Sequence, residues 1–268
     1  MIEYIMNNAL GKIEKGSCLL NIYRDPAKIS LYLQNWIKEQ FSSTNAAGAI
    51  LGISGGIDSA VLAGLLAGAL GPDRVTGVIM PCHSQQMDED YARSLASALG
   101  IKTYKVDLSA AFDSISEAIS AEGLALDALP SANIKPRLRM AALYAIAQQN
   151  GYLVCGGGNK DEIMYGYFTK HGDSGVDLLP LADLLKGEVR ALAGYLGIPQ
   201  DIIDRPPTAG LWAGQTDESE MGLTYEELDC YLAAGIASDE ARGKIENAIS
   251  RSGHKRKFPL AAVLPNDF

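Results

Sequence analysis

The chain has 268 residues, of which 47% are hydrophobic and 21% charged, which fits a folded globular protein and excludes a disordered chain or a coiled coil. Acidic residues outnumber basic ones by 32 to 23, so we expect no binding to nucleic acid or to a membrane surface, because both need a basic surface. The most apolar stretch, residues 59–70, is too short to span a bilayer. The four cysteines lie far apart and the N-terminal segment has no targeting signal, so we expect reduced thiols in a cytoplasmic protein.

Helices and strands alternate along the first 155 residues. In chain order, the pattern predicts a helix over 26–41, a strand over 47–53, a helix over 57–70, a strand over 75–80, a helix over 88–99, a strand over 101–106, helices over 109–119 and 131–149, and a strand over 152–155. This order indicates an α/β fold, a doubly wound and mostly parallel sheet flanked by helices. Its ligand is expected at the carboxyl ends of the strands.

The C-terminal part has a different pattern, with a predicted helix over 181–195 and an irregular polar stretch over 205–222. We find no internal repeat and no low-complexity linker. We therefore expect one domain with a helical C-terminal part, residues 26–268, preceded by an N-terminal extension, residues 1–25, whose role the sequence does not indicate.

The strongest functional signal is the octapeptide GISGGIDS, residues 52–59, between the first strand and the next helix. Its glycines let backbone amides approach phosphate oxygens, Ser54 and Ser59 add hydroxyl donors, and the helix N-terminus adds partial positive charge. It matches neither GxxxxGK[ST] nor GxGxxG. Asp58 is a candidate Mg²⁺ ligand, because carboxylates hold the Mg²⁺ that bridges phosphates. The alternative is a glycine-rich turn in which Asp58 and Ser59 only cap the helix.

The SGGIDS segment resembles the loop of the N-type ATP pyrophosphatases, of the adenine nucleotide alpha hydrolase-like superfamily, which cleave ATP between its α- and β-phosphates and adenylate a substrate. Further segments are similar to the ammonia-dependent NAD synthetases: NIKPRLRM at 133–140, GGGNKDE at 156–162, GYFTKHGD at 166–173, PPTAGLW at 206–212, QTDE at 215–218 and HKR at 254–256. The resemblance runs in order from about residue 26 to residue 264.

The resemblance implies ATP-dependent amidation of nicotinic acid adenine dinucleotide (deamido-NAD) by ammonia, the last step of NAD biosynthesis. The products would be NAD, AMP and pyrophosphate, formed through an acyl-adenylate. ATP would be the co-substrate, Mg²⁺ the cofactor and a homodimer the assembly. The first 46 residues leave no room for a glutaminase domain, so ammonia would be free or delivered by a separate protein.

The resemblance also assigns roles to single residues. The ATP contacts would be Gly52, Ile53, Ser54, Gly55, Gly56, Ile57, Asp58, Ser59, Gly157, Lys186 and Thr208. Asp58 and Glu162 would bind Mg²⁺, and Asp58, Lys186 and Asp173 would take part in catalysis. The dinucleotide contacts would be Arg137, Lys170, Asp177, His254 and Lys255. Gly157 departs from the family, which usually has Thr there, and removes one hydroxyl contact worth about 0.5–1.5 kcal/mol.

Other interpretations stay open at this point. Lys186 would also fit a surface lysine paired with Asp183 or Glu188, and the basic run 254–257 a solvated tail. The chain would also fit another adenylating enzyme of the superfamily, or a nucleotide-binding module without turnover. A tRNA-thiolating enzyme is disfavoured, since the chain is acidic and has no CxxC pair.

Overall fold

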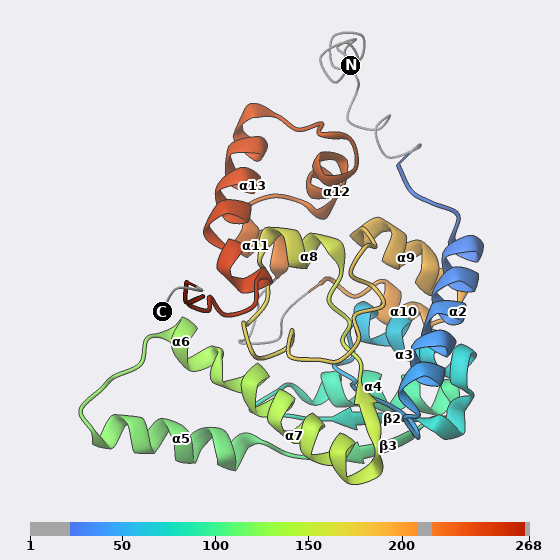
Figure 1. Cartoon of the computed structure of the whole chain (residues 1–268), viewed down its shortest axis with the longest axis horizontal. Coiled ribbons are helices and arrows are strands. Elements are labelled where there is room, and N and C mark those ends of the chain that lie inside the picture. Colours follow the sequence, from blue (N-terminus) through green and yellow to red (C-terminus); the bar gives the residue numbers. More distant parts are fainter. Residues whose placement is uncertain (1–21, 208–215, 266–268) are drawn as a thin grey trace.

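The computed structural model describes residues 22–207 and 216–265. Within them lies a four-stranded parallel sheet of β1 (Gly48–Gly52), β2 (Val75–Ile79), β3 (Lys102–Lys105) and β4 (Tyr152–Val154), in the order β3-β2-β1-β4. In the register, Ala49 lies opposite both Val75 of β2 and Leu153 of β4. The predicted α/β fold is confirmed, and Figure 1 shows the sheet low in the molecule with the helical C-terminal part above it.

Helices cover both faces of the sheet, as a doubly wound fold requires. The helices up to β4 are α2 (Pro26–Thr44), α3 (Ile57–Leu70), α4 (Gln86–Leu99), α5 (Ser109–Ala121), α6 (Ala128–Ala132) and α7 (Ile134–Asn150), with a 3-10 turn at Pro72–Arg74. Ala49 and Leu51 of β1 point into the core under α2, α3 and α9, whereas Ile50 points into the core under α7. This period of two along β1 is what a strand buried on both faces shows.

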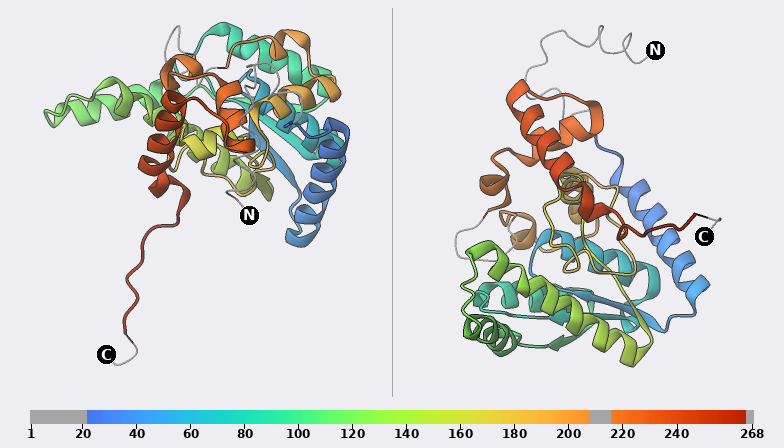
Figure 2. Two further views of the ribbon diagram at one scale, coloured as in Figure 1. Left: turned by 90° about the horizontal axis from the view of Figure 1, so that it is seen from above. Right: turned by 60° about the vertical axis from the view of Figure 1, so that its left-hand side comes forward.

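The C-terminal part consists of short helices packed above the sheet. They are α8 (Lys160–Tyr165), α9 (Lys186–Tyr195), α10 (Gln200–Ile203), α11 (Asp217–Met221), α12 (Tyr225–Ala234) and α13 (Asp239–Arg251), with a 3-10 turn at Gly253–Arg256. Tyr225, Leu228 and Ile245 form a separate apolar core among them. After α13 the chain runs away from the body as an extended arm, seen in the left panel of Figure 2. None of the described helices has both the length and the apolar character that crossing a bilayer demands.

Two predicted helices differ from the structure. The helix predicted over 131–149 is interrupted at Asn133, between α6 and α7. Pro136 explains the break, because proline has no N–H to donate and its ring would clash with the carbonyl of Ala132 in a continuous helix. The helix predicted over 181–195 begins only at Lys186, because carboxylates accept the backbone N–H groups of Leu185 and Lys186.

Candidate active site

A cavity of about 630 Å³ opens at the carboxyl ends of the strands, where the sequence analysis placed the ligand. Seven of the eight octapeptide residues line it, all except Gly55, together with the glycine run 156–158 that follows β4. The chain passes from β1 to β2 on one side and later returns to β4 on the other side of β1. The cavity therefore lies at the topological switch point of the sheet, the usual binding position in such folds.

The octapeptide has the backbone geometry of an anion cradle. Gly55 has a φ of +78°, and a Cβ there would lie 2.6 Å from the carbonyl oxygen of Asp88, so only glycine fits. Gly56 caps α3 without a side-chain hydrogen bond among the described residues. Within the loop, the Ser54 N–H donates to Ser59 Oγ and the Gly56 N–H to Ser54 Oγ. The N-terminus of α3 lies at the cavity, a position that favours an anion such as phosphate. Asp58 does not cap the helix, because it contacts residues across the cavity.

Lys186 is buried between two carboxylates at the base of the loop. Its Nζ lies 2.5 Å from Asp58 Oδ2 and 3.7 Å from Glu162 Oε1, and its side chain is only 1% exposed. Burial disfavours the charged amine, but Asp58 and Glu162 outweigh this and raise the pKa of Lys186. Burial and the nearby Asp58 raise the pKa of Glu162. The interpretation of Lys186 as a surface lysine is therefore wrong, and the site holds a fixed cation.

Asn159 is a site residue that the sequence analysis missed. It is fully buried, and its Nδ2 donates to Asp58 Oδ1 over 2.8 Å. Its side-chain oxygen also accepts the backbone N–H of Glu162, in a capping box that starts α8. One residue thus orients both candidate Mg²⁺ ligands. The signal was present in the sequence, because Asn159 and Glu162 have the N-x-x-E spacing of a capping box after a glycine run.

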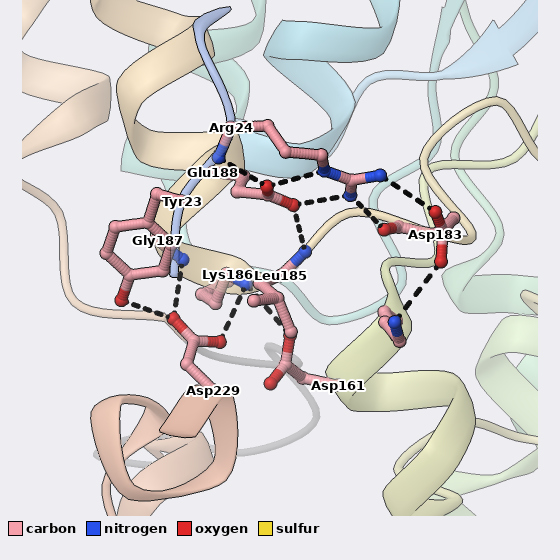
Figure 3. Close-up of polar contacts among 10 residues, drawn as sticks. Tyr23, Arg24, Asp161, Asp183, Leu185, Lys186, Gly187, Glu188 and Asp229 are labelled. Carbon is pink, nitrogen blue, oxygen red and sulfur yellow. Dashed lines mark hydrogen bonds and ion pairs between the residues drawn. The ribbon is translucent and has the colours of Figure 1, made fainter. Parts of the chain in front are cut away.

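Two buried carboxylates, Asp161 and Asp229, accept the backbone N–H of Lys186 (Figure 3). Its N–H donates to Asp161 Oδ2 over 2.8 Å and to Asp229 Oδ1 over 3.1 Å. Asp229 Oδ2 also accepts from the Gly187 N–H at 3.0 Å and from the Tyr23 hydroxyl at 2.7 Å. Burial and the charge of Asp229 raise the pKa of Asp161 to about 9. These hydrogen bonds fix the first turn of α9 and so determine how deeply the Lys186 side chain is buried.

Arg24 adds an ion pair to the same helix start. Its guanidinium donates to both oxygens of the buried Glu188 and to the exposed Asp183, as Figure 3 shows. These contacts lower the pKa of Glu188 against the opposing effect of burial. Tyr23 and Arg24 belong to the predicted N-terminal extension, for which the sequence indicated no role. The described end of that extension anchors α9.

Comparisons with known proteins agree with this geometry. A family model described as NAD synthase matches residues 29–259. The chain belongs to the NAD synthase family. It is 49% identical to an NH(3)-dependent NAD(+) synthetase of Finegoldia magna over 87% of this chain and 94% of that one, and 45% identical to one of Syntrophomonas wolfei over 90% and 98%.

Two solved structures superimpose closely on the chain. The structure of an NMN synthetase from Francisella tularensis matches with a TM-score of 0.84 and 39% identity, covering 91% of this chain and 99% of that one. An NH3-dependent NAD synthetase from Campylobacter jejuni, in complex with nitrate, matches with a TM-score of 0.73 and 27% identity over 90% and 100%.

The other residues that the family resemblance implicated fall into two places. Asp173 and Lys255 line the cavity. Asp173 Oδ1 accepts from the Thr169 N–H at 2.8 Å, and Lys255 Nζ donates to the carbonyls of Gly166 and Phe168 at 2.8 Å each. Both residues therefore hold the segment 166–173 in place at the cavity wall.

The remaining dinucleotide candidates lie outside the cavity wall. Arg137 Nε donates to the Lys170 carbonyl over 3.3 Å, and Lys170 Nζ to the His254 carbonyl over 3.0 Å, so these three form a row at the surface. Asp177 lies apart from them beside β4, where it accepts from the Val154 N–H and the Tyr144 hydroxyl. Gly157 lies at the cavity, and Thr208 is outside the described residues.

Proposed function

We propose that this member of the NAD synthase family amidates nicotinic acid adenine dinucleotide with ammonia, consuming ATP and releasing NAD, AMP and pyrophosphate. The observation that carries the proposal is the charged, buried Lys186 beside Asp58 at the foot of the octapeptide. Attack on the α-phosphate spreads negative charge over phosphate oxygens in the transition state. A fixed cation and preorganised N–H groups in an enclosed cavity stabilise that charge.

In the first half-reaction, an oxygen of the substrate carboxylate bonds to the α-phosphorus of ATP. The bond from that phosphorus to the oxygen bridging to the β-phosphate breaks, and pyrophosphate leaves. The N–H groups of the octapeptide and of the first turn of α3 would hold the phosphates, with Ser54 and Ser59 as hydroxyl donors. Lys186 would lie against the reacting phosphates.

In the second half-reaction, the nitrogen of ammonia bonds to the acyl carbon of the adenylate. The bond between that carbon and the phosphate oxygen breaks, AMP leaves with the electron pair, and the nitrogen loses a proton. The cavity walls would shield the adenylate from hydrolysis by water. Asp173 at the cavity wall is part of the proposed catalytic set, with Asp58 and Lys186.

Asp58 and Glu162 would hold the Mg²⁺ of this reaction. Both offer hard carboxylate oxygens on the two sides of Lys186 Nζ, and Asn159 fixes both. No group of three candidate metal-ligating side chains occurs among residues 22–207 and 216–265. Two carboxylates still fit Mg²⁺, which takes the rest of its ligands from water and substrate phosphates. Bound there, the ion would neutralise charge on the leaving pyrophosphate.

The acid dinucleotide would extend from the cavity to the surface row of Arg137, Lys170 and His254. Lys255 would contact it at the cavity wall, and Asp177 would accept from its ribose or adenine groups. The protein would act as a homodimer, which would cover the exposed Leu31 and Tyr32 of α2. We place it in the cytoplasm, since Cys82, Cys155 and Cys230 are free and buried.

A smaller acid substrate, nicotinic acid mononucleotide, is the second candidate. It is favoured by the match to the NMN synthetase of Francisella tularensis, with its TM-score of 0.84 over 99% of that chain. It is also favoured by the position of the Arg137, Lys170 and His254 row outside the cavity wall. The phosphate loop and Lys186 would serve both acids in the same way.

Pyrophosphate exchange into ATP, with no ammonium present, tests both candidates. Exchange that depends on the acid dinucleotide supports the main proposal, and exchange that depends only on the mononucleotide supports the second. Lys186→Met should lower the exchange at least a hundredfold. The matched control is Lys160→Met, and it should leave the exchange unchanged. Among the described residues, Lys160 Nζ pairs only with the exposed Asp183, at 3.2 Å. Exchange with neither acid would refute adenylation of a pyridine carboxylate.

A further inference from the structure

Tyr23 packs directly on the first turn of α9, beside the residue that supplies the cation of the site. Gly187 follows Lys186 in that turn, and a Cβ on Gly187 would overlap the hydroxyl end of the Tyr23 ring. Glycine weakens a helix relative to alanine, so a glycine inside a helical turn indicates that a neighbour needs the space. Here the neighbour is Tyr23, which comes from the distant N-terminal segment.

The Tyr23 hydroxyl orients the carboxylate that holds this turn (Figure 3). It donates to Asp229 Oδ2 over 2.7 Å, and the same oxygen accepts from the Gly187 N–H at 3.0 Å. Asp229 Oδ1 accepts from the Lys186 N–H at 3.1 Å. The N-cap residue of α9 is Leu185, whose side chain offers no acceptor, so a carboxylate of α12 caps the turn instead. The orientation of Asp229 therefore determines the position of the turn.

The segment that carries Tyr23 is itself fixed to α9 and to α2. The Arg24 N–H donates to Glu188 Oε1 over 2.9 Å, and the Arg24 guanidinium donates to both oxygens of Glu188. The next residue, Asp25, caps α2 by accepting the Ala27 N–H over 2.8 Å. Burial raises the pKa of Tyr23, so its hydroxyl stays a donor at neutral pH. The ring thus contacts the first turn of α9 from a fixed position.

We propose that Tyr23 is a positioning residue for adenylation, which acts through Asp229 to hold Lys186 Nζ at the reacting phosphates. The Lys186 side chain runs from this turn to Asp58, so a shift of the turn moves the amine. A displacement of about 1 Å can lower a reaction rate about a hundredfold, because the cation no longer meets the charge of the transition state. The loss falls on kcat more than on KM, since that charge develops only in the transition state. This inference rests on the proposed function, because it concerns the cation assigned to the adenylation step.

Gly187→Ala in the full chain tests the packing of Tyr23. The readout is pyrophosphate exchange into ATP with the acid substrate and without ammonium, measured over a range of ATP concentrations. The added Cβ displaces the Tyr23 ring, so kcat for exchange should fall roughly ten- to hundredfold, although alanine is the better helix former. The KM for ATP should stay within about threefold. Tyr23→Ala makes room for the Cβ, so adding Gly187→Ala to it should cause no further loss.

Tyr23→Phe keeps the ring and removes only the hydrogen bond to Asp229. It should lower kcat for exchange roughly three- to tenfold, the worth of one hydrogen bond, and leave the KM for ATP unchanged. The matched control is Tyr231→Phe on α12, which removes the hydrogen bond of its hydroxyl to Glu246 over 3.1 Å and should leave the exchange unchanged. A variant that lost only stability would have a lower urea midpoint and would keep the kcat of its folded form.

An unchanged kcat in either Tyr23→Phe or Gly187→Ala would overturn the positioning role of Tyr23. A further loss when Gly187→Ala is added to Tyr23→Ala would overturn it as well, and so would an equal loss in Tyr231→Phe. Absence of exchange in the unaltered protein would instead refute the proposed function.

Discussion

Lys186→Met removes the buried cation between Asp58 and Glu162. The resulting loss in the free energy of unfolding measures how much this cation stabilises the two carboxylates. Methionine keeps the length of the side chain and fits against the Tyr225 ring, so the change removes mainly the charge. Asp58, 2.5 Å away, and Glu162, 3.7 Å away, would then face each other without a cation. Breaking a fully buried ion pair costs about 3–5 kcal/mol. Both carboxylate side chains are 20% exposed, so we expect a loss of about 2–3 kcal/mol in the free energy of unfolding at pH 9.

The loss should depend on pH with a definite sign. The folded-state pKa of Glu162 is already raised by burial and by Asp58, and removing Lys186 takes away the group that lowers it. The folded variant then binds a proton that the unfolded chain has released, so its free energy of unfolding falls as pH rises above about 4.5. Below the Glu162 pKa of about 8 in the unaltered protein, this group is protonated in both folded forms. The destabilisation relative to the unaltered protein should therefore grow as the pH rises above about 8 and be smaller at pH 7.

Urea unfolding without nucleotide or Mg²⁺, at pH 7 and pH 9, is the appropriate assay. With an m-value of about 3 kcal/mol/M, the midpoint should fall by about 1 M at pH 9 and by clearly less at pH 7. Lys160→Met should move it by less than about 0.2 M at either pH, because its ion pair with Asp183 is at the surface. An equal loss for Lys186→Met at the two pH values would refute the claim that Lys186 neutralises these carboxylates.

Three further substitutions test other contacts. Asp229→Ala should cost about 2–4 kcal/mol in urea unfolding, because the Gly187 N–H and the Tyr23 hydroxyl lose their acceptor. Asp161→Asn should cost under about 1 kcal/mol, because burial and Asp229 raise the pKa of Asp161 and so disfavour its charged form. Equal costs for the two variants would contradict this. Gly55→Ala should cost at least about 1–2 kcal/mol of unfolding free energy and raise the KM for ATP, because of the +78° φ and the 2.6 Å approach to the Asp88 carbonyl; an unchanged KM would count against the cradle. Gly157→Thr should lower the KM for ATP about two- to twelvefold, because the threonine hydroxyl adds one hydrogen-bond donor. A Cβ at this position would lie 3.4 Å from the backbone of Asp58, which is an ordinary contact. A raised KM would show that the loop has no room for the threonine side chain.

The sheet and its flanking helices followed from the sequence because their signals are local. Strand periodicity, the Gly71-Pro72 turn and the helix ending before Gly100 each depend on neighbouring residues only, and the structure confirms them. The position of the octapeptide at the cavity could be predicted in the same way, because its strand, loop and helix are consecutive in the chain.

The state of Lys186 could not be predicted in this way. Nothing near it in the sequence shows that Asp58 lies against its amine, or that Asp229 of α12 accepts its backbone N–H. The neighbouring Asp183 and Glu188 favoured a surface lysine at position 186 that pairs with one of them. In the structure, both carboxylates form ion pairs with Arg24 instead. Contacts between distant segments decide burial, and spacing along one helix does not encode them.

The central claim is tested most directly by following the products of the unaltered protein with ATP, Mg²⁺, nicotinic acid adenine dinucleotide and ammonium. We expect NAD, AMP and pyrophosphate to form in equal amounts, and glutamine in place of ammonium to give none of them. ADP and phosphate as the ATP products, or AMP without NAD in the presence of ammonium, would contradict amidation through an acyl-adenylate in this cavity.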